Sequence, residues 1–179
     1  MALTKMDPEE KTYTISLRVA QGFNALSRIV GLFSGRGFNI DSISFGDAEK
    51  PEYARVTITT HGDRRIIDQI ILQLDKLVDV LNVEDLTYIP HMERELALIK
   101  VSSNPRNQSE IIQVINVFRG NVIDITPDSL TIEVTGRNNK VDATISMLRR
   151  FGLLEVARTG TVALKREYQD SIYSNANEE

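Results

Sequence analysis

The chain has 179 residues, enough for one large domain or two small ones. Its net charge of −4 argues against a nucleic-acid-binding surface, which usually carries a basic excess. It contains no cysteine, which excludes disulfides and thiolate zinc sites, and no apolar run that approaches the roughly 18 residues of a membrane-spanning helix. We therefore expect a cytoplasmic globular protein with neither a nucleic-acid nor a membrane partner.

Hydrophobic periodicity predicts six elements in the first half of the chain. Residues 13–19 alternate apolar and polar, which indicates a strand with one buried face. Apolar residues then recur every three or four positions from Leu26, which indicates a helix, with Asn24 as its N-cap and Gly37 as the left-handed residue that ends it. The remaining elements are strands at residues 40–45 and 56–60, a helix at 66–74 capped by Asp63, and a strand at 78–86.

The second half repeats this order. Strands are predicted at residues 96–101, 122–125, 130–134 and 153–163, and helices at 111–118 and 141–148. The repeat includes two similar motifs, Arg36-Gly-Phe-Asn-Ile-Asp41 and Arg119-Gly-Asn-Val-Ile-Asp124. Each half is thus a βαββαβ unit, and the fold class is α+β: two tandem ferredoxin-like domains, each an antiparallel sheet with both helices on one face.

The predicted boundaries are a disordered tail at 1–11, a first domain at 12–88, a linker at 89–92, a second domain at 93–167 and a disordered tail at 168–179. The first sheet is expected to leave one face bare, and four small polar side chains mark it: Thr14, Ser16, Thr57 and Thr59. Small domains with a bare sheet face bury too little surface alone, so we expect a homodimer.

No catalytic constellation or metal site is visible. His61 and His91 are interpreted as surface or turn residues, since no partner is set by spacing. The segment Ala20-Gln-Gly-Phe23 is similar to the phosphate loop of acylphosphatases, but Leu26 stands where those enzymes have an arginine. An RNA-recognition domain is disfavoured too, because Tyr13 is the only base-stacking candidate on the two central strands.

The sequence closely resembles the small, regulatory subunit of acetohydroxyacid synthase (acetolactate synthase). The most specific matching run is Ala25-Leu-Ser-Arg-Ile-Val-Gly-Leu-Phe-Ser-Gly-Arg-Gly-Phe-Asn-Ile-Asp-Ser-Ile43. Four shorter matches follow in order: Gln73-Leu-Asp-Lys-Leu-Val-Asp-Val80, Glu93-Arg-Glu-Leu-Ala-Leu-Ile-Lys-Val101, Phe118-Arg-Gly-Asn-Val-Ile-Asp124 and Glu155-Val-Ala-Arg-Thr-Gly160.

The resemblance implies an ACT domain, which is a ligand-binding ferredoxin-like domain, followed by an ACT-like domain. It implies no active site and no cofactor in this chain; thiamine diphosphate, magnesium and FAD belong to the large catalytic subunit. That subunit is the expected partner, which the small subunit activates and subjects to feedback by a branched-chain amino acid, usually valine, in valine, leucine and isoleucine biosynthesis. The alternative is a free-standing amino-acid-sensing ACT protein that acts on another enzyme.

The same resemblance implies an effector site between two chains, formed by a loop of one and an Asn-Ile pair of the other. The expected effector-binding residues are Gln21, Gly22, Phe23, Asn24, Ala25, Asn39 and Ile40. The unpaired N–H groups of a helix N-terminus suit the effector carboxylate. The alternative, that Asn24 is only a cap and Asn39 only a turn residue, remains open.

This loop departs from the family pattern Asn-x-x-Gly, because it has Gln21 and Asn24 instead. A side chain at the glycine position takes up space beside the ligand, so we expect weakened valine sensitivity with activation retained. In the second half, Val122 and Ile123 are predicted to correspond to Asn39 and Ile40, and Arg119-Gly120 to end a helix with the glycine as cap.

Overall fold

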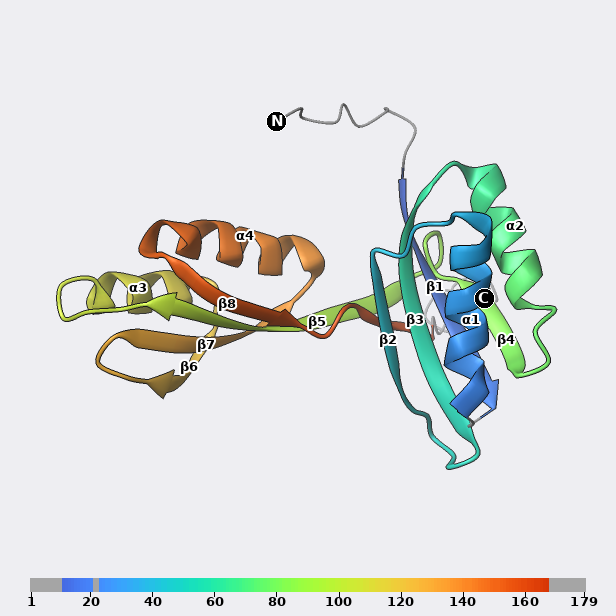
Figure 1. The fold of residues 1–179 in the computed structure, drawn as a ribbon, viewed down its shortest axis with the longest axis horizontal. Coiled ribbons are helices and arrows are strands. Elements are labelled where there is room, and N and C mark those ends of the chain that lie inside the picture. The colour runs from blue at the N-terminus through green and yellow to red at the C-terminus, as the bar shows by residue number, and fades with distance from the viewer. Residues whose placement is uncertain (1–10, 21–22, 168–179) are drawn as a thin grey trace, which may run out of the picture.

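The computed structural model describes residues 11–20 and 23–167, and its first unit has the predicted order of elements. These elements are β1 (Lys11–Ala20), α1 (Phe23–Arg36), β2 (Ser42–Asp47), β3 (Tyr53–Gly62), α2 (Arg64–Leu74) and β4 (Val80–Asp85). The strands form one antiparallel sheet in the order β2-β3-β1-β4, and both helices cover the same face of it (Figure 1).

The second unit repeats the arrangement. Its elements are β5 (His91–Ser102), α3 (Gln108–Val117), β6 (Asn121–Ile125), β7 (Ser129–Gly136), α4 (Asn138–Leu148), a 3-10 turn (Arg149–Phe151), β8 (Leu153–Arg158) and β9 (Val162–Lys165). The sheet order β6-β7-β5-β8 matches the first unit, and β9 pairs with the beginning of β5. The predicted fold class, two ferredoxin-like units in tandem, is confirmed.

Each unit has its own hydrophobic core between sheet and helices. In the first, Leu17 and Ile58 from the sheet pack against the helical residues Ile29 and Phe33. In the second, the core includes Ile99, Ile132, Ile111 and Val141. The duplication extends to a matching irregularity, because the register to the last sheet strand shifts between Arg18 and Val19 in β1 and between Lys100 and Val101 in β5.

The outer face of the first sheet is covered, so the prediction of a bare face was wrong. The first residues of β5 pair with β9, from His91 with Lys165 to Arg94 with Val162. This two-stranded segment, called the ribbon below, lies across the first sheet (Figure 1), and the backbone N–H of Ala163 donates to Thr57 Oγ1 at 3.3 Å. Four side chains beneath or beside it are buried: Thr14, Ser16, Thr57 and Thr59.

The reason is a break in the last predicted strand, residues 153–163. Strand β8 ends at Arg158, the chain bends at Gly160 with φ +74°, and it then continues along β5, in the same direction, as β9, which lies over the first sheet. An ideal Cβ on Gly160 would lie 3.1 Å from the Cβ of Ser42, so the absence of a side chain permits a close approach. Two residues of the predicted linker, 91 and 92, therefore belong to a strand.

The helix ends of the first unit agree with prediction in two of three cases. Gly37 has φ +69°, and the N–H of Phe38 donates to the carbonyl of Phe33 at 3.0 Å, as in a glycine-ended helix. Asp63 caps α2 by accepting a hydrogen bond from the N–H of Arg65 at 2.6 Å. Asn24, in contrast, lies within the first turn of α1, which begins at Phe23, so its prediction as N-cap was wrong.

The second helix end differs from prediction. The left-handed residue is Arg119, with φ +51°, and the N–H of Gly120 donates to Ile115. Gly120 is required for space instead, because an ideal Cβ there would lie 3.0 Å from the carbonyl oxygen of Glu133. These hydrogen bonds align Arg119 with Gly37. The sequence motif instead aligns Gly120 with Gly37, so the two alignments differ by one residue.

This shift removes the predicted equivalence of the two motifs. The second unit enters β6 at Asn121, directly after its helix end, whereas the first enters β2 only at Ser42. Asn39 and Ile40 lie in a connection without counterpart in the second unit, and Val122 and Ile123 lie within strand β6. The predicted correspondence of Asn39 and Ile40 with Val122 and Ile123 was wrong, because similar residues in the two motifs occupy different structural positions.

Candidate functional site

The predicted effector residues lie at two ends of one helix. Asn24 and Ala25 are in the first turn of α1, and Asn39 and Ile40 follow its last turn. A helix of 14 residues is about 21 Å long, so one chain does not bring the two groups together. The site was predicted to form between two chains, and it stays a prediction. Gln21, Gly22 and the side chain of Phe23 lie outside the described residues.

The segment after α1 is held by specific polar contacts. The hydroxyl of Thr60 donates to the carbonyl oxygen of Asn39 at 2.6 Å, and the Asn39 amide nitrogen lies 3.5 Å from His61 Nε2. His61 Nδ1 lies 2.6 Å from a carboxylate oxygen of Asp41. His61 is therefore a partnered residue rather than an isolated turn histidine. The backbone at Asn39 is fixed while its side chain is exposed, a geometry that can present an amide to a ligand.

The start of α1 is held by core packing and by an ion pair. Ala25 is buried in the core, so only its backbone could contact an effector, whereas Asn24 is exposed. Arg28 forms an ion pair with Asp79 at 2.8 Å, which links α1 to the start of β4. The Arg28 guanidinium thus has a structural partner.

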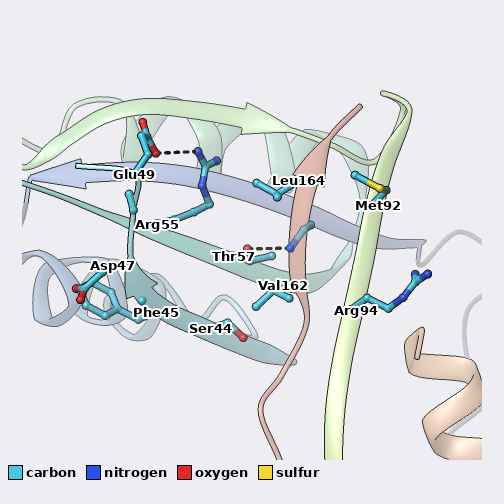
Figure 2. Close-up of a pocket in the computed structure, with 13 residues that line it drawn as sticks. Ser44, Phe45, Asp47, Glu49, Arg55, Thr57, Met92, Arg94, Val162 and Leu164 are labelled. Atoms are coloured by element: carbon cyan, nitrogen blue, oxygen red, sulfur yellow. Dashed lines mark hydrogen bonds and ion pairs between the residues drawn. The ribbon is translucent and has the colours of Figure 1, made fainter. Parts of the chain in front are cut away.

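An apolar groove lies between β2 and the ribbon, where the sequence predicted none. Its cavity is about 510 Å³, and Figure 2 shows Val162 and Leu164 on β9 near Met92 on β5, with Ser44 and Thr57 of the first sheet beside them. Phe45 also lines the cavity, but it pairs with the core residue Val56 and so its side chain lies on the helix-covered face of the sheet. The side chains of Val162, Leu164 and Met92 are between 48% and 52% exposed, which is high for large apolar groups on one two-stranded segment. Periodicity could not reveal the groove, because its walls come from elements distant in sequence.

Charged residues border this groove. Glu49 lies 3.8 Å from the guanidinium of Arg55 and 3.5 Å from that of Arg18 (Figure 2 shows the first pair). A backbone hydrogen bond, followed by the guanidinium groups of Arg55 and Arg18, lowers the pKa of the Glu49 carboxyl. The groove can therefore accept apolar groups with a charged neighbour.

A second, polar cleft of about 680 Å³ lies between the two units. Its walls are the outer face of the first sheet, including Thr14, and the start of α4, including Arg137. Glu93 on the ribbon and Thr161 beside the ribbon also line it. It depends on the packing of β9 against the first sheet, and so no sequence pattern signals it.

Neither of two other site types is found in the part of the chain that the structure describes. None of its helices is long and apolar enough to span a membrane. No group of three or more potential metal ligands among His, Asp and Glu lies close enough to hold an ion.

Comparisons with known proteins agree with this two-unit architecture. Residues 15–82 match the family model for the AHAS small subunit-like ACT domain, and residues 94–167 match that for the small subunit of acetolactate synthase. The crystal structure of the acetolactate synthase small subunit from Thermotoga maritima superimposes with a TM-score of 0.80 at 38% identity, over 88% of this chain and 99% of that one.

Relatives in sequence cover nearly the whole chain. The probable acetolactate synthase small subunit of Methanothermobacter thermautotrophicus is 46% identical over 92% of this chain and 97% of its own length. The acetolactate synthase small subunit of Aquifex aeolicus is 43% identical over 94% of this chain and 87% of its own length. The chain belongs to the acetolactate synthase small-subunit family.

Proposed function

We propose that this protein is the regulatory subunit of an acetolactate synthase, which binds and activates the large catalytic subunit. The observation that carries the proposal is the match to small subunits at 40% to 46% identity over most of the chain. A protein named as a small subunit implies a larger partner, and the ACT fold of the first unit suits a regulatory role.

The chemistry would lie in that partner. Thiamine diphosphate, magnesium and FAD are proposed cofactors of the large subunit, which would form acetolactate. The small subunit would act by differential binding, stabilising the more active state of the catalytic subunit.

Feedback by valine is the second part of the proposal. Asn39 has a fixed backbone and an exposed amide, and the N-terminus of α1 offers N–H groups for a carboxylate. In a dimer with facing ACT domains these two groups would come from different chains. Because Gln21 and Asn24 depart from the family pattern, we propose that valine binds weakly while activation is retained.

The test is reconstitution with the matching large subunit. Acetolactate formation is measured for the large subunit alone, with this chain, and with this chain plus valine. We expect activation and only slight inhibition by valine. The double variant Gln21→Asn, Asn24→Gly restores the family pattern and is expected to strengthen inhibition. A failure to activate would overturn the proposed function, and strong valine inhibition of the unmodified complex would overturn the proposed weak feedback.

A free-standing amino-acid-sensing ACT protein is the second candidate, supported by the separate hydrophobic core of the first unit. The two candidates differ in partner. Stable co-purification with the large subunit supports the regulatory subunit, whereas amino-acid binding without such an association supports the free-standing sensor.

A further inference from the structure

The polar cleft between the units has features of a binding site separate from the predicted effector site. Of the residues that line its roughly 680 Å³, none has a large apolar side chain. A smaller cavity of about 390 Å³ adjoins it, sharing Asp41, Thr59, Asn138 and Asp142. Both lie within the usual volume range of small-molecule sites, about 300 to 1,000 Å³.

One wall carries two threonine residues whose hydroxyl groups have no hydrogen-bond partner in the described part of the chain. Thr14 and Thr161 are 7% and 4% exposed, and both line the cleft. Their backbone N–H groups are bonded, to Thr87 and Ser42, but neither hydroxyl has a hydrogen-bond partner within the described part of the chain. Neither hydroxyl oxygen is fully shielded from solvent, since Arg18 Nε is the one buried side-chain nitrogen or oxygen without a partner among the described residues. Both hydroxyl groups are therefore available to donate a hydrogen bond to a polar ligand and to accept one from it.

The opposite wall carries positive charge. Helix α4 has 11 residues, no side-chain cap at its N-terminus and no acidic residue in its first turn. Asn138 and Asn139, which carry its first N–H groups, line the cleft together with Arg137 at the N-cap. This combination suits a carboxylate. In Figure 1 the start of α4 is the end of that helix nearest the first unit.

Carboxylates also line the cleft, and each already has a basic side chain as a neighbour. Asp41 lies 2.6 Å from His61, Asp142 lies 2.7 Å from Arg158, and Glu93 lies 3.8 Å from Arg137. A carboxylate can accept about four hydrogen bonds, so these groups can also receive an ammonium. Lys11 is held at the cleft by its contact with the Tyr88 ring, 4.4 Å from the ring centroid.

We infer that this cleft binds a small hydrophilic zwitterion, an amino acid with a hydroxyl side chain. The ligand carboxylate would contact Arg137 and the N-terminus of α4, its ammonium the acidic side chains, and its hydroxyl Thr14 and Thr161. A branched-chain amino acid is disfavoured, because no apolar wall would receive its side chain. Such a ligand would join the two units and thus bias their relative position.

The test uses the full chain and calorimetric titration with L-serine and L-threonine, with L-valine and inorganic phosphate as contrasting probes. We expect millimolar or tighter binding of a hydroxy amino acid. The double variant Thr14→Val, Thr161→Val and the single variant Arg137→Gln are each expected to weaken it at least about tenfold. Thr135→Val and Arg106→Gln, exposed positions outside the cleft, are the matched controls and should leave affinity within about twofold of the unmodified chain.

A second measurement needs no variant. Addition of L-serine to the unmodified protein should shift the amide NMR signals of Asn138 and Asn139. No binding of either hydroxy amino acid, or unchanged affinity in the folded Thr14→Val, Thr161→Val protein, would overturn the inference. Binding of phosphate alone would replace it with a simple anion site. Valine binding that survives the cleft variants would report on the proposed effector site, so the two proposals fail separately.

Discussion

At the residue scale, Glu95 is the one charged side chain that is buried in the described part of the chain. Arg158 on the neighbouring strand contacts both of its carboxylate oxygens, at 2.6 and 2.8 Å, and also Asp142 on α4 at 2.7 Å. A two-point pair of this kind satisfies a charge that burial would otherwise make very costly. It fixes β5, β8 and α4 relative to one another beside the cleft.

We therefore predict that Arg158→Met destabilises the fold by about 3 kcal/mol, because Glu95 loses its partner in a buried position. Urea denaturation followed by circular dichroism measures the change. Arg150→Gln is the control: it breaks an exposed pair with Glu110, both side chains being more than half exposed, and should cost less than about 1 kcal/mol. Equal losses in the two variants would contradict the prediction.

The ion pair of Arg158 with Glu95 should stabilise the fold over the whole neutral pH range. Its hydrogen bonds to Glu95 raise the pKa of Arg158 above the ordinary value. A group with a raised folded-state pKa stabilises the protein below its unfolded pKa and loses this effect only as pH rises through the folded one. The pKa of an arginine lies above about 12 in either state. The stability difference between Arg158→Met and the unmodified chain should therefore not fall when the pH rises from neutral to mildly alkaline.

Gly160 is the second residue on which the architecture depends. Its φ of +74° disfavours any side chain, and an added Cβ would approach Ser42 and Ser44 to 3.1 Å. Gly160→Ala is predicted to lower stability by about 1 to 3 kcal/mol in thermal or urea unfolding. Gly35→Ala provides the contrast, since that glycine lies in α1 with open space around it, and it should be neutral or stabilising by about 0.5 to 1 kcal/mol.

At the scale of elements, the ribbon decides how the two units combine. Strand β9 presents Ala163 to the first sheet, where it is 3% exposed, and Val162 and Leu164 to the other side, where they are about half exposed. The ribbon belongs by sequence to the second unit and by packing to the first. It covers the outer face of the first sheet and forms one wall of the apolar groove.

The alternation along β9 gives a matched pair of variants. Ala163→Asp would place a carboxylate against Thr57 in a buried position, and we expect a loss of more than about 2 kcal/mol with faster hydrogen exchange at residues 162–165. Leu164→Asp, one residue further and exposed, should change both measurements little. Rapid exchange in β9 of the unmodified protein would show that the ribbon is not firmly packed.

At the scale of the whole molecule, the expectation of a dimer now has a different basis. The bare sheet face that suggested it is covered by the ribbon. What remains is the family and the large apolar side chains on exposed surfaces, among them Phe45, Leu81 and Val117. We still predict a homodimer. Sedimentation equilibrium at micromolar concentration should give twice the chain mass of 20.2 kDa, and a mass equal to one chain would contradict it.

The order and type of the elements could be predicted because they depend on local pattern. Alternation in β1 and β3, helical spacing in α1 and α2, the cap at Asp63 and the left-handed Gly37 are properties of short segments. The family could also be predicted from a short segment, because the run from Ala25 to Ile43 is the most specific match to it. The candidate effector residues were also chosen in this way, and their meeting across two chains stays a prediction.

What the sequence by itself determined is therefore the two βαββαβ units and the family to which they belong. Only the tertiary structure decided that β9 extends past β8 to cover the first sheet, that Arg119 rather than Gly120 ends α3 in a left-handed conformation, and that a polar cleft forms between the units. The physical reason is range: periodicity records which face of one segment is buried, but not which distant segment buries it. Thr57 meets Ala163 across 106 residues, and no local pattern specifies that contact.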